Sequence, residues 1–225
     1  MSNIALITAA GSGRRMGEDK PKQFLIVNGK PLLSYAIEAF NNHPLIDEIL
    51  IVTNEDYIDE VKSFSNKYSK VKHIIKGGDT RQESVFMGLS FLKENGYHST
   101  DIILIHDGAR PLVNEKIITE NIKVCQEHDA VETVISATDT IIESKDGETN
   151  NKTLNRKELF QVQTPQTFKL ELIFQAHTQL QNNDATDDAQ LVAKLGKEIF
   201  LVIGDKKNFK ITTKEDLEYF ELLTK

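Results

Sequence analysis

The sequence predicts an α/β fold in which a mainly parallel sheet carries helices on its faces. Short apolar runs rich in β-branched residues alternate with helical patterns along most of the chain, as parallel strands joined by helices require. The 225 residues are 39% hydrophobic and 27% charged, a composition typical of a globular protein that buries a core without disulfides. Since no repeat or linker divides the sequence, we expect residues 1–225 to form a single domain.

Six apolar runs predict the strands. They cover Ile4–Ala9, Glu48–Thr53, Val71–Lys76, Ile102–His106, Ala130–Ala137 and Glu198–Ile203. Helices are predicted from apolar residues that recur on one face, or from start signals such as Pro31 and the capping-box pattern Thr212-Thr213-Lys214-Glu215-Asp216. They cover Leu32–Asn41, Arg81–Glu94, Asn114–His128 and about Lys214–Leu223.

The alternation breaks once, between Thr138 and Gln166. Two extended segments surround the polar stretch Ser144–Lys152, and Asp146-Gly147 is a turn signal. We therefore expect a projecting β-hairpin arm at about residues 138–166. Its charged, amide-rich composition offers little apolar surface to pack on a sheet, so the arm either projects into solvent as an insertion or docks on a partner subunit.

Composition restricts the partners and the compartment. The chain has 27 Lys and Arg against 34 Asp and Glu, a net charge of −7, and so lacks the basic field that nucleic-acid or anionic-membrane binding needs. A single cysteine, Cys125, cannot form an internal disulfide. The short apolar run Ile4–Ala10 has no basic segment before it and resembles neither a signal peptide nor a membrane span. We expect a cytoplasmic protein that binds neither nucleic acid nor membrane.

A glycine-rich segment, Ala9-Ala10-Gly11-Ser12-Gly13-Arg14-Arg15-Met16-Gly17, follows the first predicted strand. Two glycines let the backbone approach a phosphate with its N–H groups. A dinucleotide fingerprint would need glycine in place of Met16, and a P-loop would need Gly-Lys-Ser/Thr. Arg14, Arg15 and Lys22 instead form a basic cluster that suits a triphosphate whose charge rises as pyrophosphate departs; the alternative is a solvated basic loop.

Two further segments follow predicted strands. In His106-Asp107-Gly108-Ala109-Arg110-Pro111, Asp107 stands where ligands bind in open α/β sheets and is a candidate Mg²⁺ ligand, while Arg110 could hold a phosphate. The alternative is that Asp107 caps a turn and pairs with Arg110. In the segment Gly77–Ser84, glycines bring the backbone close to a flat ligand, and Asp79 and Ser84 could meet the edge of a base. Helix capping by Asp79 or Thr80 explains that segment equally well.

Together these segments resemble a known family. The glycine loop, continued by Pro21-Lys22-Gln23, is similar to the signature loop of sugar-nucleotide nucleotidyltransferases. Matches then follow along nearly the whole chain: Gly77-Gly78-Asp79-x-Arg81-x-x-Ser84, His106-Asp107-Gly108-Ala109-Arg110-Pro111, Asp139-Thr140, Arg156, Thr164-Pro165-Gln166 and Thr186-Asp187-Asp188-Ala189. By these motifs the chain resembles the 2-C-methyl-D-erythritol 4-phosphate cytidylyltransferase family of the non-mevalonate isoprenoid pathway.

The resemblance implies a role for each matching position. The loop residues Ala9, Ala10, Gly11, Ser12 and Gly13 wrap the CTP triphosphate, and Arg15 and Lys22 stabilise the charge that develops at the α-phosphorus. Cytosine is read by Gly78, Asp79 and Ser84, and Asp107 binds Mg²⁺ or another divalent cation. The acceptor, a polyol phosphate, is held by Arg156 and Lys210, with Arg110, Thr140 and Thr164 nearby.

The resemblance also implies a Rossmann-like fold and a homodimer in which the arm reaches the partner's active site. A phosphate oxygen of the acceptor attacks the α-phosphorus of CTP, and no general base is needed because a phosphate monoester is already anionic. One position departs from the family: Lys207 stands where some members have an acidic residue, and nearby Asp205 has no assigned role.

Three alternatives remain at this point. Ribitol-5-phosphate cytidylyltransferase shares the loop and the arm, and Ala130–Ser136 looks somewhat like that enzyme. The segments Gly108–Arg110 and Leu154–Leu159 favour the methylerythritol substrate. A dinucleotide-dependent oxidoreductase is disfavoured by Met16, and a non-catalytic nucleotide-binding regulator by the presence of the two cations Arg15 and Lys22.

Overall fold

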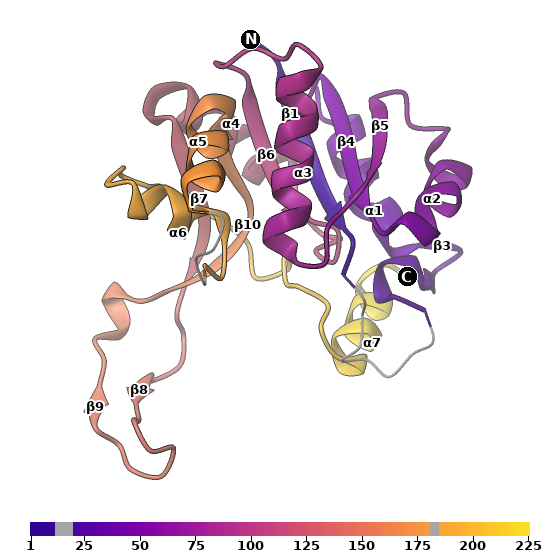
Figure 1. The fold of residues 1–225 in the computed structure, drawn as a ribbon. Coiled ribbons are helices and arrows are strands. Elements are labelled where there is room, and N and C mark those ends of the chain that lie inside the picture. The colour runs from indigo at the N-terminus through magenta and orange to yellow at the C-terminus, as the bar shows by residue number, and fades with distance from the viewer. Residues whose placement is uncertain (12–19, 181–184) are drawn as a thin grey trace.

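The six predicted strands and one that was not predicted, β10, pair in one sheet, in the order β11-β7-β10-β6-β1-β4-β5. A computed structural model describes residues 1–11, 20–180 and 185–225. The strands of this sheet are β1 (Asn3–Ala9), β4 (Glu48–Thr53), β5 (Val71–Lys76), β6 (Ile102–Asp107), β7 (Ala130–Ser136), β10 (Phe160–Lys169) and β11 (Phe200–Ile203). The six predicted strands are confirmed to within a residue or two at their ends, and the fold class is as expected (Figure 1).

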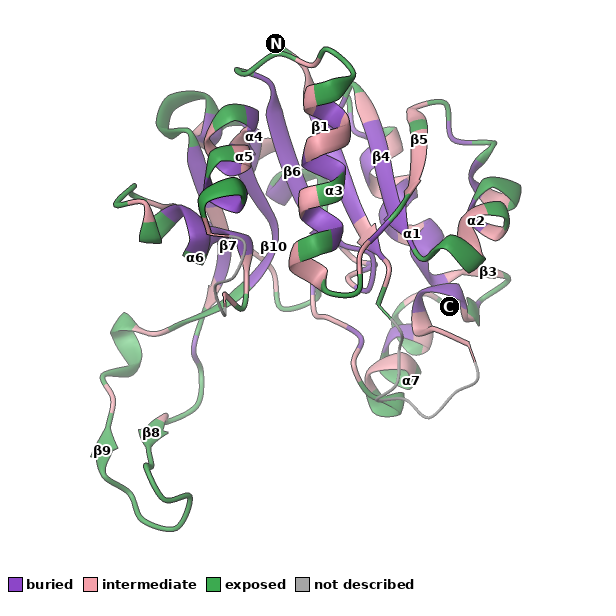
Figure 2. Ribbon diagram, in the orientation of Figure 1, coloured by how far each residue is buried: buried purple, intermediate pink, exposed green. Residues whose placement is uncertain are grey.

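Helices cover both faces of the sheet. On one face lie α1 (Leu32–Asn42), α2 (Ile58–Ser65) and α4 (Glu115–His128), and on the other lie α3 (Arg81–Glu94), α5 (Leu170–Gln179) and α6 (Asp188–Lys194). Strand β1 shows why both faces are covered: Ala5 and Ile7 belong to one core cluster and Ile4 and Leu6 to the other, and all four are buried. A strand that is apolar on both faces must be covered on both. Figure 2 shows the resulting buried centre.

The C-terminal helix α7 (Lys214–Leu223) packs in a third, smaller core beside the short hairpin β2 (Ile26–Val27) and β3 (Lys30–Pro31). Thr213 caps α7 in the predicted capping box with Asp216. Phe220 of α7 is buried with Ile211, which lies one residue after Lys210. This small core therefore fixes the segment that carries Lys210. No helix of the described residues is long and apolar enough to cross a membrane.

Strand β10 corrects the predicted extent of the arm. The arm was expected to run to Gln166, but the chain enters the sheet at Phe160 and runs antiparallel between β6 and β7. The register shifts between Gln163 and Gln166, and Pro165 lies within this irregularity. Proline has no backbone N–H to donate, and at this position the regular pairing of the strands does not require one. What projects is the pair β8 (Ile142–Glu143) and β9 (Lys152–Thr153), whose residues are exposed (Figures 1 and 2).

Candidate active site

A cleft of about 720 Å³ lies at the carboxyl ends of β1, β4 and β6. The strand register produces it, since Thr8 pairs with Asp107 and Ala9 with Thr53, which brings the loops after these strands to one edge. The predicted site residues that line the cleft are Ala9, Ala10, Gly11, Lys22, Gly78, Asp79, Ser84, Asp107 and Lys210. The segments picked out by the sequence thus meet in space.

The start of the glycine loop is held by Gln23. Its buried side chain donates from Nε2 to the carbonyl oxygens of Ala9, at 2.7 Å, and Gly11, at 2.8 Å. Four predicted residues of the loop, Ser12, Gly13, Arg14 and Arg15, lie outside the described residues. Their roles therefore stay predictions.

Lys22 begins a short 3-10 helix (η2, Lys22–Phe24) directly after Pro21. Its Nζ donates to the carbonyl oxygen of Ile211 at 2.5 Å, and the side chain lines the cleft. A lysine tied to the backbone next to Lys210 is already ordered. Holding its ammonium at the cleft therefore requires little further loss of side-chain entropy on binding an anion.

Close packing shapes the segment after β5. A Cβ on Gly77 would lie 2.7 Å from Ser84 Oγ and 2.8 Å from the Ala10 side chain, and a Cβ on Gly78 would lie 2.4 Å from Glu83 Cβ. These two glycines let the backbone press against α3. Thr80, not Asp79, caps α3, in a capping box with Glu83, so Asp79 remains exposed at the cleft and keeps its side chain for other partners.

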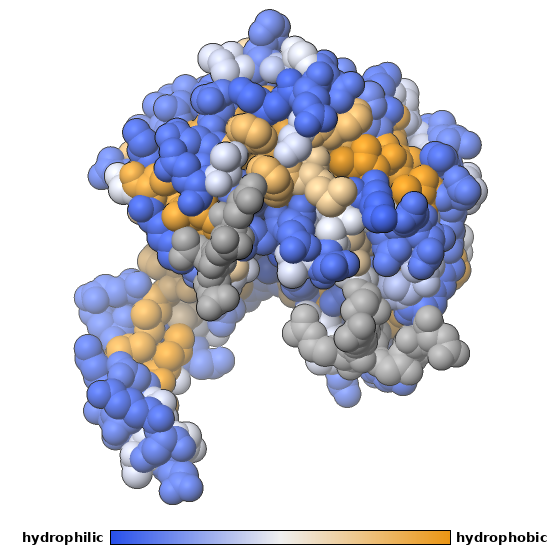
Figure 3. All heavy atoms as spheres, viewed as in Figure 1, coloured by the Kyte–Doolittle hydropathy of each residue, from blue (hydrophilic) through white to orange (hydrophobic). Residues whose placement is uncertain are grey.

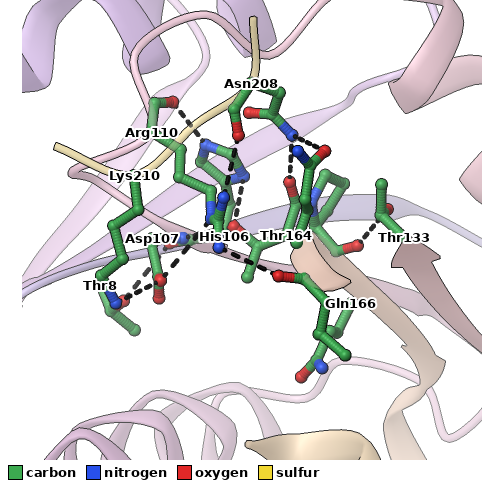
Figure 4. Close-up of polar contacts among 12 residues, drawn as sticks. Thr8, His106, Asp107, Arg110, Thr133, Thr164, Gln166, Asn208 and Lys210 are labelled. Carbon is green, nitrogen blue, oxygen red and sulfur yellow. Dashed lines mark hydrogen bonds and ion pairs between the residues drawn. The ribbon is translucent and has the colours of Figure 1, made fainter. Parts of the chain in front are cut away.

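Asp107 is the electrostatic centre of the cleft (Figure 4). Its Oδ2 accepts from Lys210 Nζ at 2.7 Å and its Oδ1 from Arg81 Nε at 3.1 Å, while Arg110 Nε lies 3.9 Å from Oδ2. Burial by itself would raise the pKa of Asp107, but the charges of Arg81 and Lys210 outweigh it and hold that pKa well below its usual range. The carboxylate is therefore ionised at neutral pH.

A buried polar network fixes the backbone of Asp107. The Thr164 hydroxyl accepts from the Asp107 N–H at 3.1 Å and lies 3.0 Å from His106 Nδ1, while His106 Nε2 lies 3.0 Å from the carbonyl oxygen of Arg110. Burial lowers the pKa of His106 to about 4, so the ring is neutral. It accepts from Thr164 at Nδ1 and donates to Arg110 from Nε2. Thr164 is thus a buried support for Asp107, not a lining residue.

Arg110 likewise supports the site from behind. It donates from Nη1 to the carbonyl oxygen of Asn208 at 2.9 Å and from Nη2 to that of Val162 at 3.3 Å. Asn208 is buried and donates to the carbonyl oxygen of Thr164 at 2.8 Å. Arg110 does not line the cleft. It pairs with Asp107, as the alternative interpretation of this motif proposed, and ties β6 to the chain before Lys210.

Thr140 and Arg156 lie on the arm and not at the cleft of their own chain. Both are exposed, and Arg156 donates from Nη1 to the carbonyl oxygen of Thr138 at 2.8 Å. Within one chain the described residues therefore bring together Lys22, Lys210, Ala9–Gly11 and Gly78 but not these two residues.

The acidic groups in the described part of the cleft are few. Asp79 and Asp107 line it, and residues 1–11, 20–180 and 185–225 contain no group of three or more His, Cys, Asp or Glu that could hold a metal by themselves. Asp205 does not line the cleft; its Oδ1 accepts from the Lys207 N–H at 2.8 Å. A single ionised carboxylate fits Mg²⁺ when substrate phosphates supply the other oxygens.

Arg81 has no predicted role, although it belongs to the motif Gly77-Gly78-Asp79-x-Arg81-x-x-Ser84. Arg81 is the first residue of α3 and lines the cleft between Asp107 and Asp188. A cation at the first turn of a helix is a weak sequence signal, because helix starts favour acidic residues. Gln23 was also missed as a support, since its contacts to Ala9 and Gly11 are invisible without the fold.

Known proteins are similar to this chain over its whole length. Residues 3–225 match the family described as 2-C-methyl-D-erythritol 4-phosphate cytidylyltransferase. A protein of that name from Clostridium acetobutylicum is 43% identical, with 99% of this chain and 97% of the relative covered.

Solved structures agree. The 4-diphosphocytidyl-2C-methyl-D-erythritol synthase of Anaerococcus prevotii has a TM-score of 0.85 at 29% identity, covering 99% of this chain and 98% of that one. The 2-C-methyl-D-erythritol 4-phosphate cytidylyltransferase of Thermus thermophilus has a TM-score of 0.79 at 31% identity, covering 100% and 99%. The chain therefore belongs to the 2-C-methyl-D-erythritol 4-phosphate cytidylyltransferase family.

Proposed function

We propose that the cleft transfers the cytidylyl group of CTP to 2-C-methyl-D-erythritol 4-phosphate, giving CDP-methylerythritol and pyrophosphate. One observation carries this proposal. In a chain of this family, Lys22, Lys210 and the ionised Asp107 line one cleft with Ala9–Gly11, the start of the glycine segment, and with Gly78 and Asp79. Fixed cations next to close-packed glycine backbone provide the charge and the room that a nucleoside triphosphate needs.

The nucleotide lies between two loops. We assign the triphosphate to Ala9, Ala10 and Gly11 with Ser12 and Gly13, and the cytosine to the segment of Gly78, Asp79 and Ser84. Ser84 donates from Oγ to the carbonyl oxygen of Thr80 at 2.9 Å, so its hydroxyl oxygen keeps a lone pair for the amino group of the base.

The reaction needs charge stabilisation more than proton transfer. The acceptor's phosphate oxygen attacks the α-phosphorus in line, and pyrophosphate leaves. Lys22 and Arg15 offset the charge that grows on the phosphorus oxygens, and Lys210 orients the attacking phosphate. Asp107, with the CTP phosphates, would hold Mg²⁺, which when bound neutralises charge on the triphosphate.

The acceptor site needs a second copy of the chain. Arg156 and Thr140 are exposed on an arm away from their own cleft, and we propose that they serve the partner's cleft in a homodimer. Large apolar side chains are exposed on the arm and at the start of the adjoining strand β10: Ile142, Phe160 and Val162, at 48%, 41% and 40%. Figure 3 shows a hydrophobic patch on the arm above its hydrophilic tip, as a surface that a second copy covers would have.

The single cysteine suits a reducing compartment, and we propose that the enzyme works in the cytoplasm. Cys125 is buried, and burial raises the pKa of its thiol to about 12. Such a thiol is inert toward disulfide exchange.

The function is tested by pyrophosphate release from the purified protein with Mg²⁺, each nucleoside triphosphate, and either methylerythritol phosphate or ribitol 5-phosphate. We expect rapid release only with CTP and methylerythritol phosphate. The relatives' names do not favour the ribitol substrate. Release with CTP and ribitol 5-phosphate alone would reassign the acceptor, and no release with any pair would contradict the transferase.

A further inference from the structure

Arg81 bridges two carboxylates that belong to different parts of the fold. Its Nε lies 3.1 Å from Asp107 Oδ1 at the end of β6, and its Nη1 lies 2.8 Å from Asp188 Oδ2 at the start of α6. Arg81 lines the cleft, whereas Asp188 does not. The guanidinium thus has one edge on the proposed metal-binding carboxylate and another anchored outside the cleft.

Asp188 has further contacts besides its ion pair with Arg81. It is 1% exposed, its Oδ1 accepts from His177 Nε2 at 3.0 Å, and its backbone N–H donates to Gln166 Oε1 at 3.1 Å. Burial would raise the pKa of Asp188, but the charge of Arg81 and the hydrogen bond from His177 hold it below its usual value. Asp188 is therefore a fixed, ionised anchor.

A need for stability alone does not explain this anchor. The buried Asp188 and the half-buried Arg81 lose hydration that their attraction only partly offsets. An apolar pair of similar size is often as stable or more so. An arginine that spans two fixed carboxylates, however, has its planar fork held in one orientation. The arrangement gives precision of placement at Asp107, the carboxylate proposed to hold the metal.

We propose that Asp188 is a positioning residue for the cytidylyl transfer: it orients Arg81, and through Arg81 it holds Asp107. The inference rests on the function proposed above. Without the charge of Asp188, the guanidinium is free to turn and to take both oxygens of Asp107 as a bidentate pair. Asp107 would then be less available to Lys210 and to the metal–triphosphate complex.

The test is a double-mutant cycle of Asp188→Asn and Arg81→Lys. The lysine of the second variant keeps the positive charge but cannot span both carboxylates. Mutation of a residue that supports a metal ligand typically lowers metal affinity or activity 10–100-fold. We therefore expect Asp188→Asn to lower kcat by about that factor and to change KM for CTP less than about threefold. In the Arg81→Lys background the same substitution should cost less than about twofold, since residues that act through one another are not additive.

Asn121→Ala is the matched control for lost stability. Asn121 is buried in a polar network with Thr133 and Thr167 and does not line the cleft. Its substitution should lower the melting temperature and leave kcat unchanged. All kinetics are measured below the onset of melting for every variant.

Two results would overturn the positioning role while the enzyme itself is active. One is a folded Asp188→Asn variant with the kcat of the wild type. The other is a loss of kcat that is the same in the presence of Arg81 and of the Arg81→Lys substitution, because Asp188 would then act by another route. Absence of turnover by the wild type would contradict the proposed function, and this inference with it.

Discussion

Asp107 lies among three cations, one of which, Arg81, is shared with Asp188. Arg81 and Lys210 are in direct contact with its oxygens, and Arg110 lies within 3.9 Å. A net charge of −7 on the whole chain therefore coexists with a local excess of positive charge at the end of β6. A local cluster of fixed cations of this kind favours an anionic ligand such as the triphosphate proposed above.

Lys22 is the residue whose loss should most directly affect the chemical step. We expect Lys22→Ala to lower kcat by on the order of 10²–10³, because a fixed cation at the developing charge stabilises the transition state. Steady-state pyrophosphate release measures this change in kcat. Lys20→Ala is the matched control: Lys20 pairs with Glu60 and does not line the cleft, so its loss should leave kcat unchanged. An unchanged kcat for Lys22→Ala would remove Lys22 from this role.

Glu132 should make stability depend on pH. Burial, with the nearby charge of Asp187, raises its pKa from 4.5 to about 7. The folded protein therefore holds an extra proton between these values, and its stability falls as pH rises through 7. We expect Glu132→Gln to raise the free energy of unfolding at pH 8 by about 1 kcal/mol, a figure reduced for partial exposure, and to change it little at pH 4.5.

Urea unfolding at the two pH values measures this difference. Gln166 Nε2 donates to Glu132 Oε1 at 2.7 Å, and an amide oxygen at residue 132 can still accept that bond. Glu94→Gln, an exposed change at the end of α3, is the control and should show no such pH dependence. Equal effects at pH 4.5 and pH 8 would contradict a raised pKa for Glu132.

At the scale of elements, apolar periodicity predicted the strands and helices that have a clear repeating pattern. Strands such as β4 and β5, and the helix α3, have the predicted bounds because each combines a clear apolar pattern with clear ends. The helices α2, α5 and α6 were not predicted. Short helices such as α6 offer too few turns for a periodic signal, and their formation depends on packing against the sheet.

Strand β10 was partly missed for a related reason. Its sequence, Phe160–Lys169, contains a proline and several polar residues, and such residues predict a loop or an arm and not a buried strand. Burial in the centre of the sheet is possible because Gln163, Thr164 and Gln166 all find hydrogen-bond partners among distant residues. Local patterns do not contain such partners, so only the assembled sheet shows why this segment is a strand.

The exposed side chain at the start of β10 tests the role of the arm. We expect Phe160→Asp to shift the protein from dimer to monomer, because a charge there cannot be buried against a second copy. Light scattering after size exclusion measures the mass. Leu222→Asp on α7 is the matched control, since Leu222 is also exposed and lies away from the arm. A dimeric Phe160→Asp variant, or a wild type that is already monomeric, would contradict an interface at this point.

At the scale of the whole molecule, the structure brings predicted residues from distant parts of the sequence to one cleft. Lys22 and Lys210 are nearly the length of the chain apart and yet line one cleft, as the family resemblance implied. Arg110 donates to the backbone carbonyl oxygens of Asn208 and Val162, and its expected contact with a phosphate stays a prediction. Arg156 does not reach its own cleft at all. No pattern within a chain specifies whether an arm serves its own site or its neighbour's.

Mixed dimers distinguish these two arrangements. If Arg156 acts in the partner's cleft, a hybrid of one Lys22→Ala chain and one Arg156→Ala chain contains one intact site and one doubly defective site. Random association makes half of the dimers hybrids, so the co-expressed mixture should recover about a quarter of wild-type kcat although each variant alone is nearly inactive. Lys22→Ala mixed with Lys210→Ala is the control: both side chains line the same chain's cleft, every hybrid site lacks one cation, and activity should stay low. If Arg156 instead acts in its own cleft, the first mixture will recover no more activity than the control.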